Sequence, residues 1–234
     1  MNRQVILDQV VLTVLDLGRN QKLLTQLPHE IVENLALAAC LMPGVRDADE
    51  DPHDGSPEFI TYNDLFLLGV GKEELLQRAL DNSVRCLQPQ FESLVSKLGM
   101  NLPESQFPPV FVLTNQYALY GAACVFYPGL LAKIARLLGG DFYIVPSSIH
   151  EVLILPVDAP GIAALHSAQL EANRLPDPEF RDILNDDVYR YFTEDEELRL
   201  VQVNAEEPEC AEFTLSGFTK ESGSGRIPDC TGNR

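Results

Sequence analysis

The segment PSSIHEVLILP, residues 146–156, combines side chains that could carry out nucleophilic chemistry. Ser147 or Ser148 could act as the nucleophile with His150 as its base, and Glu151 could orient the base. Such a site needs the hydroxyl within hydrogen-bond reach of the imidazole and a carboxylate on the other ring nitrogen. The serines have no GxSxG elbow and no glycine-built oxyanion site beside them. The competing interpretation is a turn between two strands, in which the hydroxyls bond local backbone.

Oxygen-bearing side chains in the acidic stretch that follows Arg46 could bind a metal ion. Asp47, Asp49 and Asp51 stand at positions 1, 3 and 5 of a calcium-loop register, and Glu58 stands at position 12. Oxygen ligands at this spacing are what Ca²⁺ coordination requires. Pro52 occupies position 6, where the sharp turn of such a loop normally has glycine. The alternative is a solvated, charged loop at the tip of a hairpin.

The stretch YGAACVFYP offers a third candidate, a surface for a ligand or partner. Gly121 opens a patch of small residues, where a ligand or another backbone could approach closely. Tyr117, Tyr120 and Tyr127 lie near it in the sequence. Packing of these residues in the core beneath a helix is the alternative explanation.

The bulk composition limits the classes of function. Seventeen basic and 35 acidic residues give a formal charge of −18, which disfavours direct contact with nucleic acid or an anionic membrane. The N-terminal apolar stretch is interrupted by charged residues and shows no signal-peptide pattern. The five cysteines are scattered without a CxxC pair, which argues against a zinc ribbon and a disulfide framework. We therefore expect a cytoplasmic protein without a cofactor.

Periodicity and turn residues predict the secondary structure of most of the chain. Helices are expected over 5–17, 20–27, 64–69, 72–87, 128–140 and 160–174, with Asn63 as the cap of the third. Strands are expected over 59–62, 110–114, 122–127, 141–145, 151–156, 187–192 and 198–203. The stretch NLALAACLM, residues 34–42, fits either a helix or a strand. Consecutive strands separated by tight turns favour an antiparallel sheet.

Three stretches resemble a bacterial family known only as a domain of unknown function. They are FITYNDLFLLGVGKEEL (59–75), the region with VFVLTN and YGAACVFYPGLLAKIARLLGGDFYIVPSSIHEVLILP (110–156), and DDVYRYF (186–192). The resemblance covers about residues 5–192 and implies small cytoplasmic proteins from gut-associated bacteria. It implies that NLALAACLM and FITY are paired strands around a variable acidic loop, which resolves the first as a strand. It also leads us to expect that the chain lacks an N-terminal segment usual in that family. It implies no activity.

We therefore predict an α+β fold with a largely antiparallel sheet of about six strands and helices packed on it. Residues 1–203 would form one domain, with a helical and hairpin part over 1–105 and a sheet–helix core over 106–203. Residues 204–234 would be a disordered acidic, Gly/Ser-containing tail.

For function, we expect a non-catalytic binding or regulatory module that acts through its sheet face or a groove near Gly121. The expected partner is another protein of basic character, and neither nucleic acid nor a membrane is expected. The alternative is a small serine-dependent hydrolase that uses Ser147 or Ser148 with His150 and a carboxylate such as Glu151 or Asp141.

Overall fold

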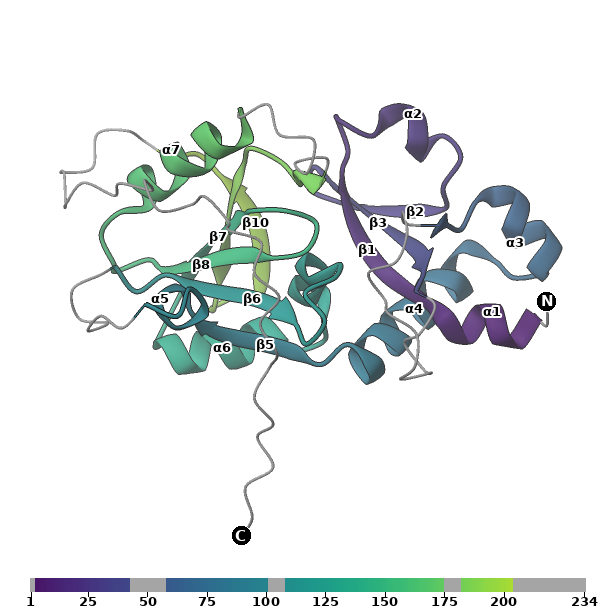
Figure 1. Cartoon of the computed structure of the whole chain (residues 1–234), viewed down its shortest axis with the longest axis horizontal. Coiled ribbons are helices and arrows are strands. Elements are labelled where there is room, and N and C mark those ends of the chain that lie inside the picture. The colour runs from purple at the N-terminus through teal and green to yellow at the C-terminus, as the bar shows by residue number, and fades with distance from the viewer. Residues whose placement is uncertain (1–2, 43–57, 101–107, 175–181, 204–234) are drawn as a thin grey trace, which may run out of the picture.

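Two antiparallel β-sheets lie beside each other in the computed structural model of the chain (Figure 1). The structure describes residues 3–42, 58–100, 108–174 and 182–203. The first sheet, sheet A, comes from the N-terminal part of the chain, and the second, sheet B, from the part after residue 86. The predicted α+β class and the six-stranded antiparallel sheet are confirmed by sheet B. The sequence did not predict that a second sheet would accompany it.

Sheet A has the strand order β1–β3–β2, and the short strand β4 pairs with the end of β3. Its strands are β1 (Val10–Asp16), β2 (His29–Val32), β3 (Leu35–Leu41) and β4 (Glu58–Phe59). Its helices are α1 (Arg3–Gln9), α2 (Gln21–Leu24), α3 (Tyr62–Leu68) and α4 (Lys72–Cys86). The pairing of Cys40 with Phe59 confirms the expectation that NLALAACLM and FITY are paired strands.

Sheet B has the strand order β10–β9–β7–β8–β6–β5 and is antiparallel throughout. Its strands are β5 (Pro89–Ser93), β6 (Phe111–Asn115), β7 (Phe142–Pro146), β8 (Val152–Pro156), β9 (Val188–Phe192) and β10 (Glu197–Val201). The helices of this part are α5 (Leu94–Lys97), the 3₁₀ helix η2 (Gly121–Phe126), α6 (Leu130–Leu138) and α7 (Ile162–Asn173).

Side chains alternate between the two faces of sheet B, and both faces are buried. Ile144 and Ile154 belong to a large apolar cluster that includes residues of η2, α6 and sheet A. Their neighbours Val145 and Leu155 belong to a second cluster, which includes Ile162 of α7. Helix α7 therefore packs on one face of sheet B. Sheet A, η2 and α6 pack on the other face.

Helix α4 covers the outer edge of β1. The Asn82 side-chain amide donates to the backbone oxygens of Leu7 at 3.0 Å and Val10 at 2.9 Å. The Leu12 N–H donates to the Ser83 hydroxyl at 2.8 Å. These buried bonds satisfy backbone groups that a sheet edge would otherwise leave unpaired. They also fix α4 against β1, and a groove is lined by residues of both elements.

A polar network joins the two sheets. The Tyr189 hydroxyl on β9 donates to the side-chain oxygen of Asn34, which lies between β2 and β3. Asn185 donates to the same hydroxyl at 2.6 Å, and Asn34 donates to the Asp187 carboxylate. Burial raises the pKa of Tyr189 well above its usual value, so the hydroxyl remains a donor at neutral pH.

Several predicted elements are confirmed with small shifts at their ends. They are the helices α4, α6 and α7, the β7–β8 hairpin and the β9–β10 hairpin. Gly139 ends α6 in the left-handed conformation, as its position predicted. Thr61, not Asn63, caps α3, because its side chain accepts the Asp64 N–H while Asp64 accepts the Thr61 N–H.

Two predicted elements were wrong. Residues 5–17 begin in helix α1 but continue as strand β1 from Val10, and all seven residues of β1 are buried. A run that is apolar at nearly every position matches helical spacing by chance, and its valines favour a strand. Residues 122–127 were predicted as a strand but lie mostly in η2, whose residues Gly121–Val125 are all buried. This run has no alternating polar position that could have distinguished the two structures.

Candidate functional site

His150 lies in the turn between β7 and β8, and both of its ring nitrogens have partners in the fold. The Tyr120 N–H donates to Nδ1 at 3.1 Å. Nε2 lies 3.1 Å from the Asp182 carboxylate oxygen Oδ2. Because Nδ1 accepts a hydrogen bond, the ring proton of the neutral imidazole sits on Nε2 and is donated to Asp182. The carboxylate that meets His150 is therefore Asp182, which the sequence did not indicate.

The two serines do not form a nucleophile–base pair with His150. The Ser148 hydroxyl accepts the backbone N–H of His150 at 3.0 Å, and the Ser148 N–H donates to the Glu151 carbonyl. Ser147 is half-buried, and no hydrogen bond between its hydroxyl and the imidazole occurs in the described part of the chain. Glu151 forms an ion pair with Lys97 of α5 at 2.7 Å. This is the bonding pattern of a serine-containing turn.

The other carboxylate considered for this site, Asp141, is held elsewhere. Its Oδ1 accepts the Thr193 hydroxyl at 2.6 Å and the Thr193 N–H at 2.9 Å, and its Oδ2 meets Arg190 at 2.7 Å. The Thr193 hydrogen bonds, with the Arg190 guanidinium, lower the pKa of Asp141 to about 2. This carboxylate therefore joins the loop before β7 to the end of β9.

Gly121 is a point of close backbone approach. A Cβ at this position would lie 2.3 Å from the His150 carbonyl oxygen and 2.3 Å from Thr114 Oγ1. The Thr114 hydroxyl donates to that same carbonyl at 2.8 Å. The group that approaches Gly121 is thus the backbone of the His150 turn, and this contact fixes the start of η2 against the turn.

The three tyrosines near Gly121 have separate surroundings. Tyr120 is buried and hydrogen-bonds with the Cys40 thiol, whose pKa burial raises to about 12. The Tyr127 hydroxyl donates to the Leu87 carbonyl, and Tyr117 is half-buried with its N–H bonded to Asn115. The structure therefore does not bring these tyrosines together on one surface.

The candidate calcium ligands fall mostly outside the described residues. Asp47, Asp49 and Asp51 are not described, and Glu58 is an exposed residue of β4. Among the described residues, no group of three or more His, Cys, Asp or Glu side chains is placed to hold a metal ion. Across the same residues, no helix is long and apolar enough to cross a membrane.

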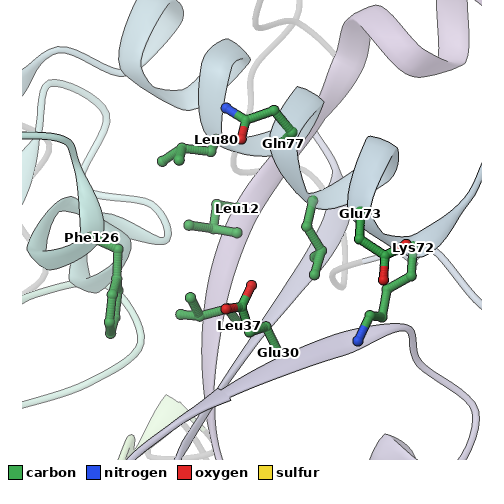
Figure 2. A pocket seen from close by; sticks show the side chains of 9 residues that line it. Leu12, Glu30, Leu37, Lys72, Glu73, Gln77, Leu80 and Phe126 are labelled. Carbon is green, nitrogen blue, oxygen red and sulfur yellow. The ribbon is translucent and has the colours of Figure 1, made fainter.

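An open groove of about 510 Å³ lies between sheet A, α4 and the end of η2, and we call it the α4 groove (Figure 2). This volume is within the range of roughly 300–1,000 Å³ that is usual for ligand sites. It is lined by Leu12, Glu30, Leu37, Lys72, Glu73, Leu76, Gln77, Leu80 and Phe126. None of these residues was predicted as a site residue.

Strand register explains why sheet A presents apolar side chains to the groove. Directly paired residues of antiparallel strands share a face, and so do residues two apart. Val14 pairs with Leu37, and Leu37 pairs with Glu30 on its other side. Leu12 is two residues before Val14 and therefore lies on the same face. Sheet A thus supplies one leucine from β1, one leucine from the central strand β3 and one carboxylate from the edge strand β2.

Helix α4 and η2 form the opposing walls. Leu76 and Leu80 are one turn apart on α4 and contribute apolar surface, while Lys72, Glu73 and Gln77 bring polar groups. Figure 2 shows Phe126 on the opposite side of the groove from Lys72 and Glu73, which lie at the start of α4. The groove therefore has an apolar part and a charged end.

The charged groups of the α4 groove have no hydrogen-bonding or ion-pair partner in the described part of the chain. Glu30 and Glu73 are exposed and Lys72 is half-buried. Within the described ranges, none of the three forms an ion pair or side-chain hydrogen bond. Two carboxylates and one ammonium give the groove a net formal charge of −1, of the same sign as the whole chain.

Comparisons with known proteins identify the family of the chain. The profile described as Family of unknown function (DUF5688) matches residues 1–193. No curated protein and no solved structure shows a match to the chain. The chain belongs to the DUF5688 family.

Proposed function

We propose that this member of the DUF5688 family is a non-catalytic binding module that holds a basic segment of another protein in the α4 groove. The observation that carries the proposal is the combination of open volume, apolar walls and charged side chains that have no partner among the described residues. Apolar walls favour burial of one or two apolar side chains, and a few polar groups at the rim set orientation. This arrangement suits recognition better than bond-making chemistry.

Charge complementarity supports a basic partner. Glu30 reaches the groove from β2 and Glu73 from α4, so an arginine or lysine placed between them would meet two carboxylates. The overall charge of −18 would speed the encounter with a cationic segment. Lys72 opposes a second cation at its end of the groove and therefore limits where the partner's charge can sit.

The hydrolase alternative has weaker support. A serine nucleophile needs a ring nitrogen of His150 as its base, and both nitrogens are engaged by Tyr120 and Asp182. The Ser148 hydroxyl accepts the backbone N–H of His150 instead. A binding role for the α4 groove uses charged groups that have no partner within the described ranges of the chain.

A peptide panel tests this proposal. Fluorescent heptapeptides that combine two arginines with two leucines are titrated with the full chain, and anisotropy is measured at 150 mM salt. Peptides with glutamate in place of arginine, or serine in place of leucine, serve as controls for charge and apolar content. We expect binding of the Arg/Leu peptides only.

Variants locate the binding. The double variant Glu30→Lys/Glu73→Lys should lose at least tenfold in affinity, and Lys72→Gln should gain a few-fold. Glu194→Lys, at an exposed residue between β9 and β10, is the matched control for surface charge and should change affinity less than twofold. Equal losses in the double variant and in this control, after allowance for the difference in charge, would contradict binding in the α4 groove.

A further inference from the structure

The 3₁₀ helix η2 connects the His150 turn to the α4 groove. Tyr120, immediately before η2, donates its N–H to His150 Nδ1 at 3.1 Å. Phe126, the last residue of η2, lines the groove. At ~2 Å of rise per residue, the six residues of η2 span about 12 Å. Loss of the Tyr120–His150 hydrogen bond at one end of η2 can therefore affect the position of Phe126 at the other end.

The start of η2 is held in a conformation that needs support. Tyr120 has φ 52°, in the left-handed region, which is unfavourable for a non-glycine residue. The hydrogen bond from its N–H to His150 is one of the contacts that stabilise this conformation. The next residue, Gly121, has no room to shift toward the turn because the His150 carbonyl and Thr114 already contact its backbone.

The bond between Tyr120 and His150 requires a neutral imidazole. Nδ1 accepts the Tyr120 N–H through its lone pair, so a proton added to Nδ1 would set two donors against each other. Histidine is the side chain whose charge ordinarily changes between pH 5 and 8. Protonation of the His150 ring on Nδ1 therefore removes the hydrogen bond that holds Tyr120 and the start of η2.

The charged and titratable groups around His150 permit this change. Asp182, in the segment before β9, lies on Nε2 and would stabilise an imidazolium. Glu151 of the turn is already paired with Lys97 of α5. On the η2 side, the Tyr120 hydroxyl and the Cys40 thiol of β3 stay uncharged, because burial raises the pKa of both groups. Asp182 is thus the carboxylate that responds directly to the histidine charge.

We propose that His150 is a positioning residue for the α4 groove: its neutral form holds η2 and Phe126 in place, and its protonation releases them. This inference rests on the proposed function, because it describes the regulation of the same groove. A partner segment would accordingly bind more tightly at pH 7.5 than at pH 5.5.

Nuclear magnetic resonance on the full chain without any partner tests the coupling first. The His150 ring, the Tyr120 amide and the Phe126 ring are followed from pH 8 to pH 5. We expect all three to change with one shared midpoint. In His150→Asn the amide oxygen can accept the Tyr120 N–H without titrating, so the Phe126 change should disappear. A Phe126 ring that stays constant while His150 titrates would overturn the proposal.

A second variant, Asp182→Asn, keeps the proposal testable if His150→Asn does not fold. Asp182→Asn keeps the imidazole as the acceptor for Tyr120 but removes the carboxylate that favours its protonation. The shared transition of Tyr120 and Phe126 should therefore move to lower pH. An unchanged midpoint in Asp182→Asn would contradict the role given to this carboxylate and to the proton on the ring.

Binding of the Arg/Leu peptides gives the second readout. We expect affinity to fall at least fivefold between pH 7.5 and 5.5 in the unmodified chain and less than twofold in His150→Asn. If no peptide binds at any pH, the proposed function fails, while the resonance titration still decides the coupling of His150 to Phe126. If peptides bind with the same pH dependence in both proteins, the positioning role of His150 is wrong.

Discussion

The turn at His150 and the α4 groove differ in how the fold uses their polar groups. In the turn, the imidazole, the Ser148 hydroxyl and the Glu151 carboxylate each have a partner within the protein. In the groove, Glu30 and Lys72 have none among the described residues, although their types and spacing suggest no particular chemistry. Residue types that resemble a catalytic site therefore hold the structure together, and the groups available to a ligand lie elsewhere.

The largest effect on stability is expected at the tightest point of the turn. Gly121→Ala would place a Cβ within 2.3 Å of the His150 carbonyl and of Thr114 Oγ1. Overpacking of this kind destabilises by about 3 kcal/mol. Urea denaturation measures the free energy of unfolding. Gly140→Ala is the matched control, because a Cβ there meets nothing within 4 Å, and its effect should stay below about 0.5 kcal/mol.

Asp141 contrasts with the groove carboxylate Glu30, because Asp141 forms hydrogen bonds and an ion pair within the fold. Its pKa is lowered to about 2 by the Thr193 hydrogen bonds and Arg190, so the native state favours the ionised form. The resulting stability is fully present above pH 4 and is lost as the pH falls through about 2. We expect Asp141→Asn to lower the free energy of unfolding by about 1 kcal/mol at pH 7.

The pH dependence separates this explanation from a general loss of packing. The difference between Asp141→Asn and the unmodified protein should shrink as the pH is lowered from 4 toward 2. Thermal unfolding followed by circular dichroism across this range measures it. A difference that is constant with pH would show that the ionised carboxylate is not the source of the stability.

The serines should matter less. Ser148→Ala removes one acceptor for the His150 N–H, in a half-buried turn, and should cost about 1 kcal/mol. Ser147→Ala should cost still less, within about 0.5 kcal/mol. Denaturant unfolding of both variants checks this order. Their binding of the Arg/Leu peptides at pH 7.5 should match that of the unmodified chain.

The smallest effect is expected in the groove. Glu30→Gln removes a charge that has no described partner in the fold, so the free energy of unfolding should change by less than about 0.5 kcal/mol. The same change should weaken peptide binding several-fold. A destabilisation of 2 kcal/mol or more would mean that the fold itself uses this carboxylate, and the contrast between the two regions would be lost.

Local sequence patterns predicted the elements that have clear ends. The β7–β8 hairpin follows from two runs rich in β-branched and aromatic residues around PSSIH, and Gly139 correctly indicated the end of α6. The runs at β1 and η2 were mispredicted because nearly every position is apolar and buried. Periodicity cannot identify an element that has no exposed face.

The candidate sites could be predicted only in part, for a different reason. The turn residues are neighbours in sequence, so their proximity was visible, but the partner of His150 is 32 residues away at Asp182. The α4 groove combines side chains that lie between Leu12 and Phe126 in the sequence. They come from β1, β2, β3, α4 and η2. Its shape depends on how sheet A, α4 and η2 pack, which no local pattern contains.

The central claim is that the α4 groove, and not the His150 turn, is the surface that contacts a partner. Methyl-labelled protein titrated with the Arg/Leu peptide at pH 7.5 tests it directly, since each region has its own reporters. Leu12, Leu37 and Leu80 report on the groove, and Ile149 reports on the turn. The account predicts saturable shifts of the three leucine methyl groups that exceed any shift of Ile149. Saturable shifts centred on Ile149, with the leucines unchanged, would contradict it.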